Sequence, residues 1–600
     1  MDRRAKLLSQ PTMAEFFLTS ASLRYGKTAY ITKDEKGRFK IHTTYAQLMD
    51  RAYRFASALL DDNYQTGDIM AIMSNPAVEF ALADIGATMI GCVTGGIFVT
   101  DGPELLEYKL NHLEARVFVL ENVNIHGRPQ LDKLLSIPRE NLPRLDRIVV
   151  YGPCDPAADS RIVPFEDYIG NAGPVARVSD RLYQVAPEMP LVIIYSSGTE
   201  GRPRGAILTH HNLMSAVRQA ESRSETEENR RYMDFLPPAH VFGYMMRRSI
   251  EGLGATIYIS HRDTLADDLP AVAPHIIAGV PKFFMALADR IRSRVSAMNI
   301  SIDSLEDFQK QLILRAAGLH ECQIAISGSA AIPDETVLFF KDKLGFRIDQ
   351  AYGVTETSPG ITVNTRDEWK LGTVGRTFHG VDVAIFDENM NELPPDCEGE
   401  IGVSGDNVFL GYFKDEDRTR QVVRKVGGRR WYLTGDLGML DEEGYLRITD
   451  RKDDMLVPAS GENVSSASIE NKLALHSRYA GYAVPYGTGR PHITAVVWTD
   501  ETRHENILED AHAAGVESDD IAAIQRTPEF RALLEQDLRR ALETGDFTGH
   551  ERPRAFLYLA SPGEEEVTST LKARKKFVRR KYAAQLDALY TSGAFLEIIG

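Results

Sequence analysis

The stretch TTYAQLMDRAYRFASALLDDNYQTGDIMAIM, residues 43–73, decides the fold class of this chain. From Tyr45 onward apolar side chains recur at helical spacing, behind two threonines that can cap a helix. Gly67 and Asp68 then break the pattern, and 69–73 is a short apolar run typical of a buried parallel strand. A helix that leads into a buried strand predicts an α/β protein.

The alternation continues along the chain. We expect further helices at 77–90 and 103–113, and buried strands at 91–98, 117–120, 191–195, 256–259, 276–280 and 323–327. After Gly380 the pattern changes to short alternating runs such as 381–386 and 399–403, which are typical of a smaller antiparallel sheet or barrel. We therefore predict an α/β fold with doubly wound sheets and a small β-barrel-like subdomain.

The chain has 600 residues, which is more than one hydrophobic core usually organises. A charged run, DRKDD at 450–454, marks the expected boundary between domains. We place the N-terminal domain at 1–449, a linker at 450–453 and an α+β C-terminal domain at 454–600.

Composition narrows the class of protein. The net charge of -16 argues against a nucleic-acid-binding surface over the whole molecule, although it leaves room for a local basic patch. The basic residues at the start have no apolar run behind them, and no uninterrupted apolar run of about 18 residues occurs in the sequence, so we expect neither a secretory signal nor a transmembrane helix. The cysteines are few and far apart, which predicts reduced thiols in a cytoplasmic protein: Cys92, Cys154, Cys322 and Cys397.

A glycine-rich and hydroxyl-rich segment, YSSGTEGRPRG at 195–205, follows one predicted strand. Glycines let backbone N–H groups approach phosphate oxygens, hydroxyls add donors, and a cation offsets the charge. The segment lacks the Gly-Lys-Ser/Thr ending of a Walker loop. Taken alone, it is either a phosphate loop or a surface loop.

Three further segments carry candidate chemistry. In QAYGVTET at 350–357, the Glu356 carboxylate is either an Mg²⁺ ligand or a buried structural residue. In WYLTGDLG at 431–438, Asp436 follows a glycine turn. Residues 572–581 include seven basic residues, beginning with Lys572. The simplest interpretation of this run is a solvated basic helix, and a patch that binds a membrane surface or nucleic acid is the alternative.

Together, in this order and approximate spacing, these segments resemble the motifs of the adenylate-forming (ANL) superfamily. That superfamily includes acyl-CoA synthetases, luciferases and nonribosomal adenylation domains. The resemblance covers nearly the whole chain and, within the superfamily, points to bacterial long-chain fatty acid:CoA ligases. It implies an enzyme that activates a carboxylate with ATP.

The resemblance also implies the nucleotide site. Phosphate contacts fall on Ser196, Ser197, Gly198, Thr199, Gly201 and Arg204. The adenine-binding turn at 327–333 contributes Gly328, Ser329 and Ala330. Further contacts fall on Gln350, Ala351, Tyr352, Gly353 and Thr355, where the aromatic ring packs on adenine and the threonine contacts phosphate. Mg²⁺ is assigned to Glu356 and Thr199, and the ribose hydroxyls to Asp436 and Arg451.

The same resemblance implies roles in catalysis. Lys572 reaches into the active site, where its charge would stabilise the transition state of adenylation beside Glu356. His240, in FLPPAHVFG at 235–243, either positions the carboxylate, gates the acyl pocket or is simply structural. Asp453 matches the hinge about which a mobile C-terminal domain turns between half-reactions, and the Gly461 turn helps to form the thioester-forming site.

The phosphate loop departs from the family pattern at two positions. Arg204 replaces the usual lysine, and it keeps the charge. Glu200 replaces the usual threonine, and a carboxylate about 4 Å from a phosphate costs about 1 kcal/mol in water and about 4 near a protein surface. We therefore expect Glu200 to point outward or to pair with Arg202 or Arg204.

The interpretation is an ATP-dependent acid:CoA ligase that uses ATP, Mg²⁺ and CoA, with a medium- to long-chain fatty acid as the substrate. Two enzymatic alternatives remain: transfer of the acyl group to a separate acyl carrier protein, and an aryl or natural-product acid as substrate. A third alternative is an inactive relative that acts as a binding protein. We expect no nucleic-acid partner and at most peripheral association with a membrane.

Overall fold

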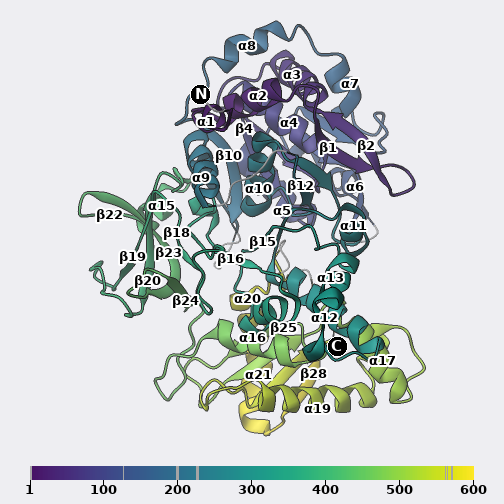
Figure 1. Ribbon diagram of the computed structural model, residues 1–600, viewed down its shortest axis with the longest axis vertical. Helices are drawn as coiled ribbons and strands as arrows, with labels where there is room; N and C mark the ends of the chain where they lie inside the picture. The colour runs from purple at the N-terminus through teal and green to yellow at the C-terminus, as the bar shows by residue number, and fades with distance from the viewer. Residues whose placement is uncertain are drawn as a thin grey trace.

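The computed structural model describes residues 3–125, 128–196, 202–223, 229–560, 562–563, 565–568 and 572–599. Figure 1 shows the N-terminal residues in purple and blue at the top, a green antiparallel sheet at the left, and the yellow-green C-terminal domain at the bottom. Four sheets carry this architecture, apart from a two-stranded hairpin of β6 (Asn124–Ile125) and β7 (Arg128–Pro129).

The first sheet has nine strands, and its central strands are parallel. In spatial order they are β18 (Arg376–Thr377), β17 (Thr362–Val363), β16 (Asp349–Tyr352), β15 (Ile324–Ser327), β14 (Ile276–Gly279), β12 (Arg231–Asp234), β13 (Thr256–Ile259), β1 (Thr28–Lys33) and β2 (Phe39–Thr44). The antiparallel strands β2, β17 and β18 lie at the edges.

The second sheet has eight strands and is parallel from β10 to β9. In spatial order they are β21 (Gly411–Tyr412), β11 (Arg204–Thr209), β10 (Pro190–Ser196), β4 (Val93–Ile97), β3 (Ile69–Met73), β5 (Val117–Glu121), β8 (Arg147–Tyr151) and β9 (Ile162–Pro164). The two parallel sheets confirm the predicted α/β class.

Helices cover both sheets and fill the space between them. Those of the N-terminal domain are α1 (Arg3–Leu8), α2 (Met13–Leu23), α3 (Tyr45–Asp61), α4 (Val78–Met89), α5 (Pro103–Leu113), α6 (Gln130–Leu135), α7 (Phe165–Gly170), α8 (Ala176–Leu182), α9 (His210–Arg223), α10 (Val241–Leu253), α11 (Leu265–Val272), α12 (Pro281–Ala297), α13 (Asp307–Ala316), α14 (Asp334–Leu338) and α15 (Glu416–Val422). Thr44 and Gln47 form a capping box at the start of α3, which confirms the threonine cap.

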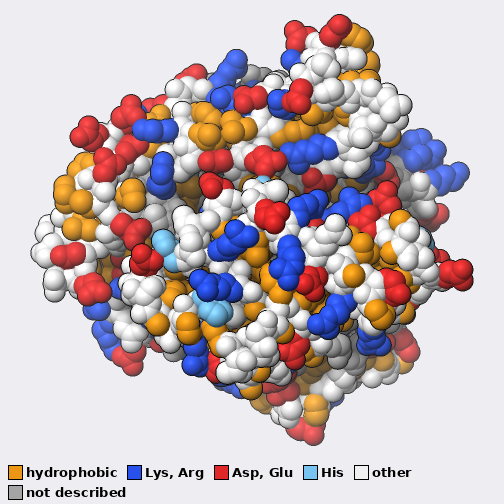
Figure 2. Space-filling view, turned by 90° about the horizontal axis from the view of Figure 1, so that it is seen from below, with side chains coloured by type: hydrophobic (Ala, Val, Ile, Leu, Met, Phe, Trp, Pro, Cys, Tyr) orange, Lys and Arg blue, Asp and Glu red, His pale blue; other side chains and the backbone are white. Residues whose placement is uncertain are grey.

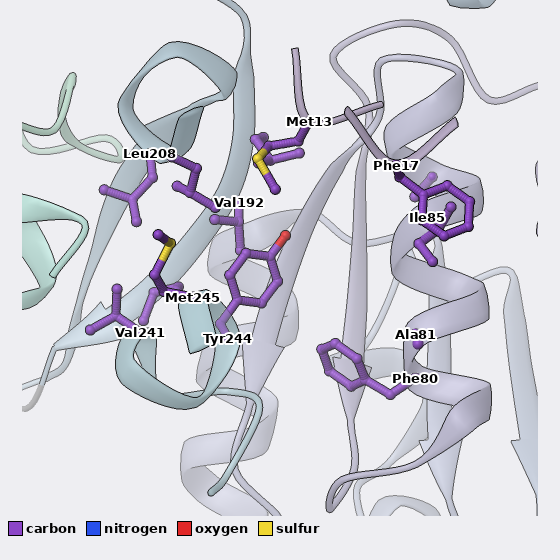
Figure 3. Close-up of a cluster of buried hydrophobic side chains, with 14 of the residues drawn as sticks. Met13, Phe17, Phe80, Ala81, Ile85, Val192, Leu208, Val241, Tyr244 and Met245 are labelled. Carbon is purple, nitrogen blue, oxygen red and sulfur yellow. The ribbon is translucent and has the colours of Figure 1, made fainter. Parts of the chain in front are cut away.

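The largest core lies between α2, α4, α10 and the second sheet. Figure 3 shows side chains from these elements converging, with Phe17, Ile85, Val192 and Tyr244 among them. Burial of such side chains contributes roughly 25 cal/mol per Å² of apolar surface. Helix α10 packs into this core, and the N-terminal end of the helix lies at the candidate site.

The third sheet is antiparallel and lies in the region after Gly380, as predicted. Its strands are β19 (Val381–Phe386), β20 (Gly399–Gly405), β22 (Val423–Val426), β23 (Arg429–Leu440) and β24 (Leu446–Arg451). The long β23 pairs with β20 on one side and with β22 and then β24 on the other. The predicted linker at 450–453 begins at the end of β24.

The C-terminal domain has its own four-stranded sheet and two hydrophobic clusters. Its strands are β25 (Tyr482–Tyr486), β26 (Thr494–Trp498), β27 (Ala555–Leu559) and β28 (Leu596–Ile599). Its helices are α16 (Ser466–His476), α17 (His504–Ala513), α18 (Ile521–Ile524), α19 (Pro528–Thr544), α20 (Lys575–Lys581) and α21 (Ala583–Ser592).

The surface of the C-terminal domain carries charges of both signs. Figure 2, seen from below, shows acidic and basic side chains interspersed over this face. Among the residues that the structure describes, none of the helices has both the length and the apolar character to traverse a bilayer.

Candidate active site

A large cavity opens where the parallel strands of the first sheet end. Strands β12, β14, β15 and β16 run in the same direction, and ligands of open α/β sheets bind outside such carboxyl ends. The connected cavity measures about 3800 Å³. Single small-molecule pockets usually measure about 300–1,000 Å³, so this cavity has room for more than one substrate.

Tyr352, Asp436 and Arg451 meet at this cavity. The Tyr352 hydroxyl donates to Asp436 Oδ2 at 2.6 Å, and Arg451 Nε donates to Asp436 Oδ1 at 2.8 Å. Asp436 and Arg451 are direct partners in the register of β23 and β24, which explains their contact. The Asp436 carboxylate raises the pKa of Arg451 further, so the guanidinium stays charged. Two residues predicted as ribose contacts and the predicted adenine-packing residue are thus brought together.

Glu356 lies in the short 3-10 helix η4 (Thr355–Thr357), and only 5% of its surface is exposed. The Tyr412 hydroxyl donates to its Oε1 at 2.8 Å. The described residues contain no cluster of three or more His, Cys, Asp or Glu side chains that could hold a metal by itself. One carboxylate with room beside it nevertheless fits Mg²⁺, which binds through one or two carboxylates plus substrate phosphates.

Lys572 reaches from the C-terminal domain to the first sheet. Its Nζ donates to the Ser329 backbone carbonyl at 2.6 Å. The side chain is exposed to the open cavity, whose walls displace part of the water around its ammonium group. This desolvation, together with the nearby Arg451 charge, lowers the pKa of Lys572 to about 8. Lys572 is therefore a cation that can lose its proton just above neutral pH.

His240 lies at the N-terminus of α10, close enough to Lys572 to sense its charge. Its Nδ1 accepts a hydrogen bond from the Phe242 backbone N–H at 3.2 Å, so it caps the helix. Desolvation and the Lys572 charge lower the pKa of His240 to about 4, so the imidazole is neutral at pH 7. His240 therefore has a structural role as a cap, and it also lines the cavity.

The predicted phosphate loop connects β10 to β11, whose ends Ser196 and Arg204 are cross-strand partners. Both residues line the cavity. Arg204 Nε lies 3.7 Å from Asp415 Oδ2, and the Arg202 guanidinium lies over the Tyr108 ring at 4.9 Å. The remaining predicted residues lie outside the described residues: Ser197, Gly198, Thr199, Glu200 and Gly201.

Most other predicted nucleotide contacts also line the cavity. These are Gly328, Ser329, Ala330, Ala351, Tyr352, Gly353 and Thr355. At Gly353 an added Cβ would lie 1.3 Å from the Pro359 carbonyl oxygen, so no other residue fits this turn. Gln350 is different: it does not line the cavity, and its Oε1 accepts from Asn364 Nδ2 at 3.3 Å.

Two predictions for the C-terminal domain have separate outcomes. Gly461 occupies an exposed turn with a φ of 81°, and it lies outside the cavity lining. The reading of 572–581 as a solvated basic helix is wrong in part, because α20 packs against acidic residues. Lys575 Nζ contacts Glu470 at 2.7 Å and Asp454 at 3.2 Å. These carboxylates raise the pKa of Lys575 although burial opposes them.

Some residues at the site escaped sequence reasoning. Tyr412, the partner of Glu356, is a tyrosine after a glycine with no motif to mark it. Lys282 and Asp500 form an ion pair at 3.0 Å between the two domains, and nothing in their local sequences indicates it. Such contacts depend on the packing of distant segments.

The family of the chain follows from its sequence as well as from this geometry. Residues 17–413, well over half of the chain, match the model of the AMP-binding enzyme family. The protein belongs to this family and is an enzyme.

Its relatives define the family membership further. It is 28% identical over 593 residues to a long-chain-fatty-acid–CoA ligase, FadD15, of Mycobacterium bovis, covering 91% of this chain and 92% of the relative. It is 28% identical to the medium-chain fatty-acid–CoA ligase of Escherichia coli, covering 79% and 78%. The crystal structure of the anthranilate CoA ligase AuaEII in complex with anthranoyl-AMP has the same fold, with 22% identity, a TM-score of 0.73 and coverage of 96% and 98%.

Proposed function

We propose that this enzyme is an ATP-dependent acid:CoA ligase that acts on medium- to long-chain fatty acids. One observation carries the proposal: Lys572 crosses between domains to Ser329, beside Asp436 and Arg451, in one cavity. A cation, ribose-binding groups and a buried carboxylate in one cavity suit the adenylation of a carboxylate. The names of the relatives support fatty acids as the substrate class.

In the proposed reaction, the acid attacks the α-phosphate of ATP and gives acyl-AMP and pyrophosphate. The thiol of CoA then attacks the acyl carbon and releases AMP. Asp436 and Arg451 hold the ribose, and Tyr352 packs on the adenine. Glu356 would hold Mg²⁺, which would neutralise phosphate charge when bound. Lys572 stabilises the charge that develops between carboxylate and α-phosphate.

The roles of Asp453 as a hinge and of Gly461 in the thioester-forming site belong to this proposal. Lys572 occupies the cavity whereas Gly461 lies outside it, as expected for an orientation that serves adenylation. Because the four cysteines form no disulfide, we propose a cytoplasmic location.

The test is the release of pyrophosphate and AMP from a panel of fatty and aryl acids, with and without CoA. We expect acid-dependent pyrophosphate release, loss of this release in Lys572→Ala, and thioester formation with CoA. Transfer only to an acyl carrier protein would favour the alternative acceptor. No release with any acid would overturn the proposal.

A further inference from the structure

Helix α5 contacts both strands that carry the predicted phosphate loop. Strand β10 ends at Ser196 and β11 begins at Arg204, and these two residues are cross-strand partners that line the cavity. Tyr108 and His112 stand four residues apart on α5, so they share one face of the helix. Neither of these two side chains lines the cavity. An effect of Tyr108 or His112 on a bound nucleotide must therefore pass through the ends of the two strands.

Tyr108 fixes the end of β11. Its hydroxyl donates to the Pro203 carbonyl at 3.2 Å, and the Arg202 guanidinium lies 4.9 Å from the centre of its ring. Pro203 lines the cavity and directly precedes Arg204. The proline ring already restricts the backbone at this position, and the hydrogen bond to its carbonyl orients the peptide bond that leads into Arg204. Tyr108 therefore fixes the backbone from which the Arg204 guanidinium extends.

His112 fixes the end of β10 through Tyr195, the residue before Ser196. The His112 Nδ1 atom and the Tyr195 hydroxyl oxygen lie 2.9 Å apart in a hydrogen bond. The Lys109 ammonium, also on α5, lies 4.9 Å from the centre of the Tyr195 ring. Lys109 is itself fixed, because it donates to Asp101 Oδ2 at 2.6 Å and both side chains are buried. The Tyr195 ring is therefore held at its hydroxyl and on one face.

The segment that follows β21 packs against the same helix face. The Phe413 backbone N–H donates to the Gly205 carbonyl at 2.8 Å, and the Phe413 ring meets the His112 imidazole edge-on, with centroids 5.3 Å apart. The Tyr108 ring stacks on the other aromatic neighbour, His112, at 5.4 Å. Desolvation and the Lys414 charge lower the pKa of His112, so the imidazole is neutral at pH 7. It therefore acts by packing and hydrogen bonding and adds no charge beside the phosphates.

We propose that Tyr108 and His112 are positioning residues for the triphosphate of ATP and act on it through Arg204 and Ser196. The latter two line the cavity and offer a guanidinium and a hydroxyl, which are donors that suit phosphate oxygens. Their placement depends on the strand ends, and misplacement by about 1 Å can cost about 100-fold in rate. The inference rests on the proposed ligase function and assigns to it two residues outside the cavity lining.

The triphosphate is present in only one of the two proposed half-reactions. Adenylation starts from ATP, whereas thioester formation starts from acyl-AMP, which has already lost pyrophosphate. Changing a positioning residue for the triphosphate should therefore raise the KM for ATP and spare the reaction of acyl-AMP with CoA. A residue needed only for the stability of the N-terminal domain would affect both half-reactions alike.

The experiment measures both half-reactions in Tyr108→Phe and His112→Phe. These variants keep an aromatic ring and lose the hydrogen bonds to Pro203 and Tyr195. Pyrophosphate release is followed with the acid that the wild-type enzyme uses best. We expect each variant to raise the KM for ATP about fivefold, because each loses one hydrogen bond that orders a strand end. The KM for the acid, and the rate at which CoA consumes purified acyl-adenylate, should stay at their wild-type values.

The control variant is Tyr590→Phe. The Tyr590 hydroxyl also donates to a backbone carbonyl, that of His492 at 2.8 Å, and its ring also packs on a histidine, with centroids 4.8 Å apart. Tyr590 lies on α21 of the C-terminal domain and does not line the cavity, so the KM for ATP should not change. An unchanged KM for ATP in the two test variants, or equal slowing of both half-reactions, would overturn the inference and leave the ligase function intact. Absence of pyrophosphate release from the wild-type enzyme with every acid would instead overturn the ligase function, and the inference with it.

Discussion

The Lys282 ammonium lies 3.3 Å from the centre of the Tyr482 ring, across the boundary between the two domains. Lys282 is at the start of α12, and Tyr482 begins β25 of the C-terminal domain. The same ammonium pairs with Asp500 at 3.0 Å. Burial raises the pKa of the Asp500 carboxyl, but Lys282 together with Thr502 and Arg503 outweighs burial, so the pKa is lowered. These contacts belong to the arrangement in which Lys572 contacts Ser329, and under the proposed rotation about Asp453 they favour that arrangement.

We predict that Lys282→Met slows adenylation and spares thioester formation. The variant keeps the aliphatic stem but loses a cation–π contact and an ion pair, which together correspond to a roughly 3- to 30-fold shift in the domain equilibrium. The measurement is pyrophosphate release for the first half-reaction and CoA consumption from purified acyl-adenylate for the second.

The matched control for this prediction is Lys343→Met, because Lys343 pairs with Asp303 within the N-terminal domain. It should change neither half-reaction. Equal slowing of both half-reactions in Lys282→Met would mean that Lys282 does not select the orientation.

Lys572 gives the adenylation half-reaction a predicted alkaline limit. Its pKa is lowered to about 8, so the side chain is cationic below this pH and loses its charge above it. The profile of kcat/KM reports the free enzyme, and we expect it to fall as pH rises through about 8. In Lys572→Arg the charge persists, so any residual activity should lack this limit. An unchanged limit in the arginine variant would assign it to another group.

The sequence could predict features that depend on neighbouring residues, but it could not predict contacts between residues far apart along the chain. The helix predicted at 103–113 has the bounds of α5, where Gly102 is the N-cap and Pro103 begins the first turn, so its start depends on local residues alone. Asp436 and Arg451 could be predicted as a pair only through their motifs, and their register on adjacent strands accounts for the contact.

The remaining features depend on tertiary packing. The basic run at 572–581 shows charge but not the acidic residues that it meets, since Asp454 and Glu470 lie more than a hundred positions away. Lys282 and Tyr482 are separated even further along the chain. The first pairs form within the C-terminal domain and the second where the two domains meet, so neither helical periodicity nor residue type predicts them.

Tyr412 should control the metal requirement through Glu356. Its hydroxyl donates to Glu356 Oε1 at 2.8 Å and orients the carboxylate. Residues that orient a metal ligand typically account for about 10- to 100-fold in metal affinity. We therefore expect Tyr412→Phe to raise the Mg²⁺ concentration needed for half-maximal adenylation by about tenfold, and Glu356→Gln to raise it more.

The control for the metal prediction is Tyr168→Phe, because the Tyr168 hydroxyl also donates to a carboxylate, Asp62 Oδ2 at 2.8 Å, but neither residue lines the cavity. Its Mg²⁺ requirement should stay close to that of the wild type. If Tyr412→Phe changed only the requirement for the acid, Glu356 would not be acting on the metal.

Glu251 anchors a buried ionic cluster behind the cavity, on the face of α10 opposite its lining. Its Oε2 accepts from Arg248 Nη1 at 2.9 Å, and its Oε1 accepts from the Tyr30 hydroxyl at 2.7 Å. Arg248 also lies 3.4 Å from Asp84 Oδ2, and these groups are almost fully buried. Removing one partner from such a cluster leaves uncompensated charge and typically costs about 3–5 kcal/mol. We predict that Glu251→Ala lowers the free energy of unfolding by that amount, measured by urea denaturation.

The control is Glu416→Ala, which removes an exposed partner of Arg420 and should change the free energy of unfolding by no more than about 0.5 kcal/mol. Equal stability of the two variants would show that the Asp84 carboxylate alone neutralises Arg248.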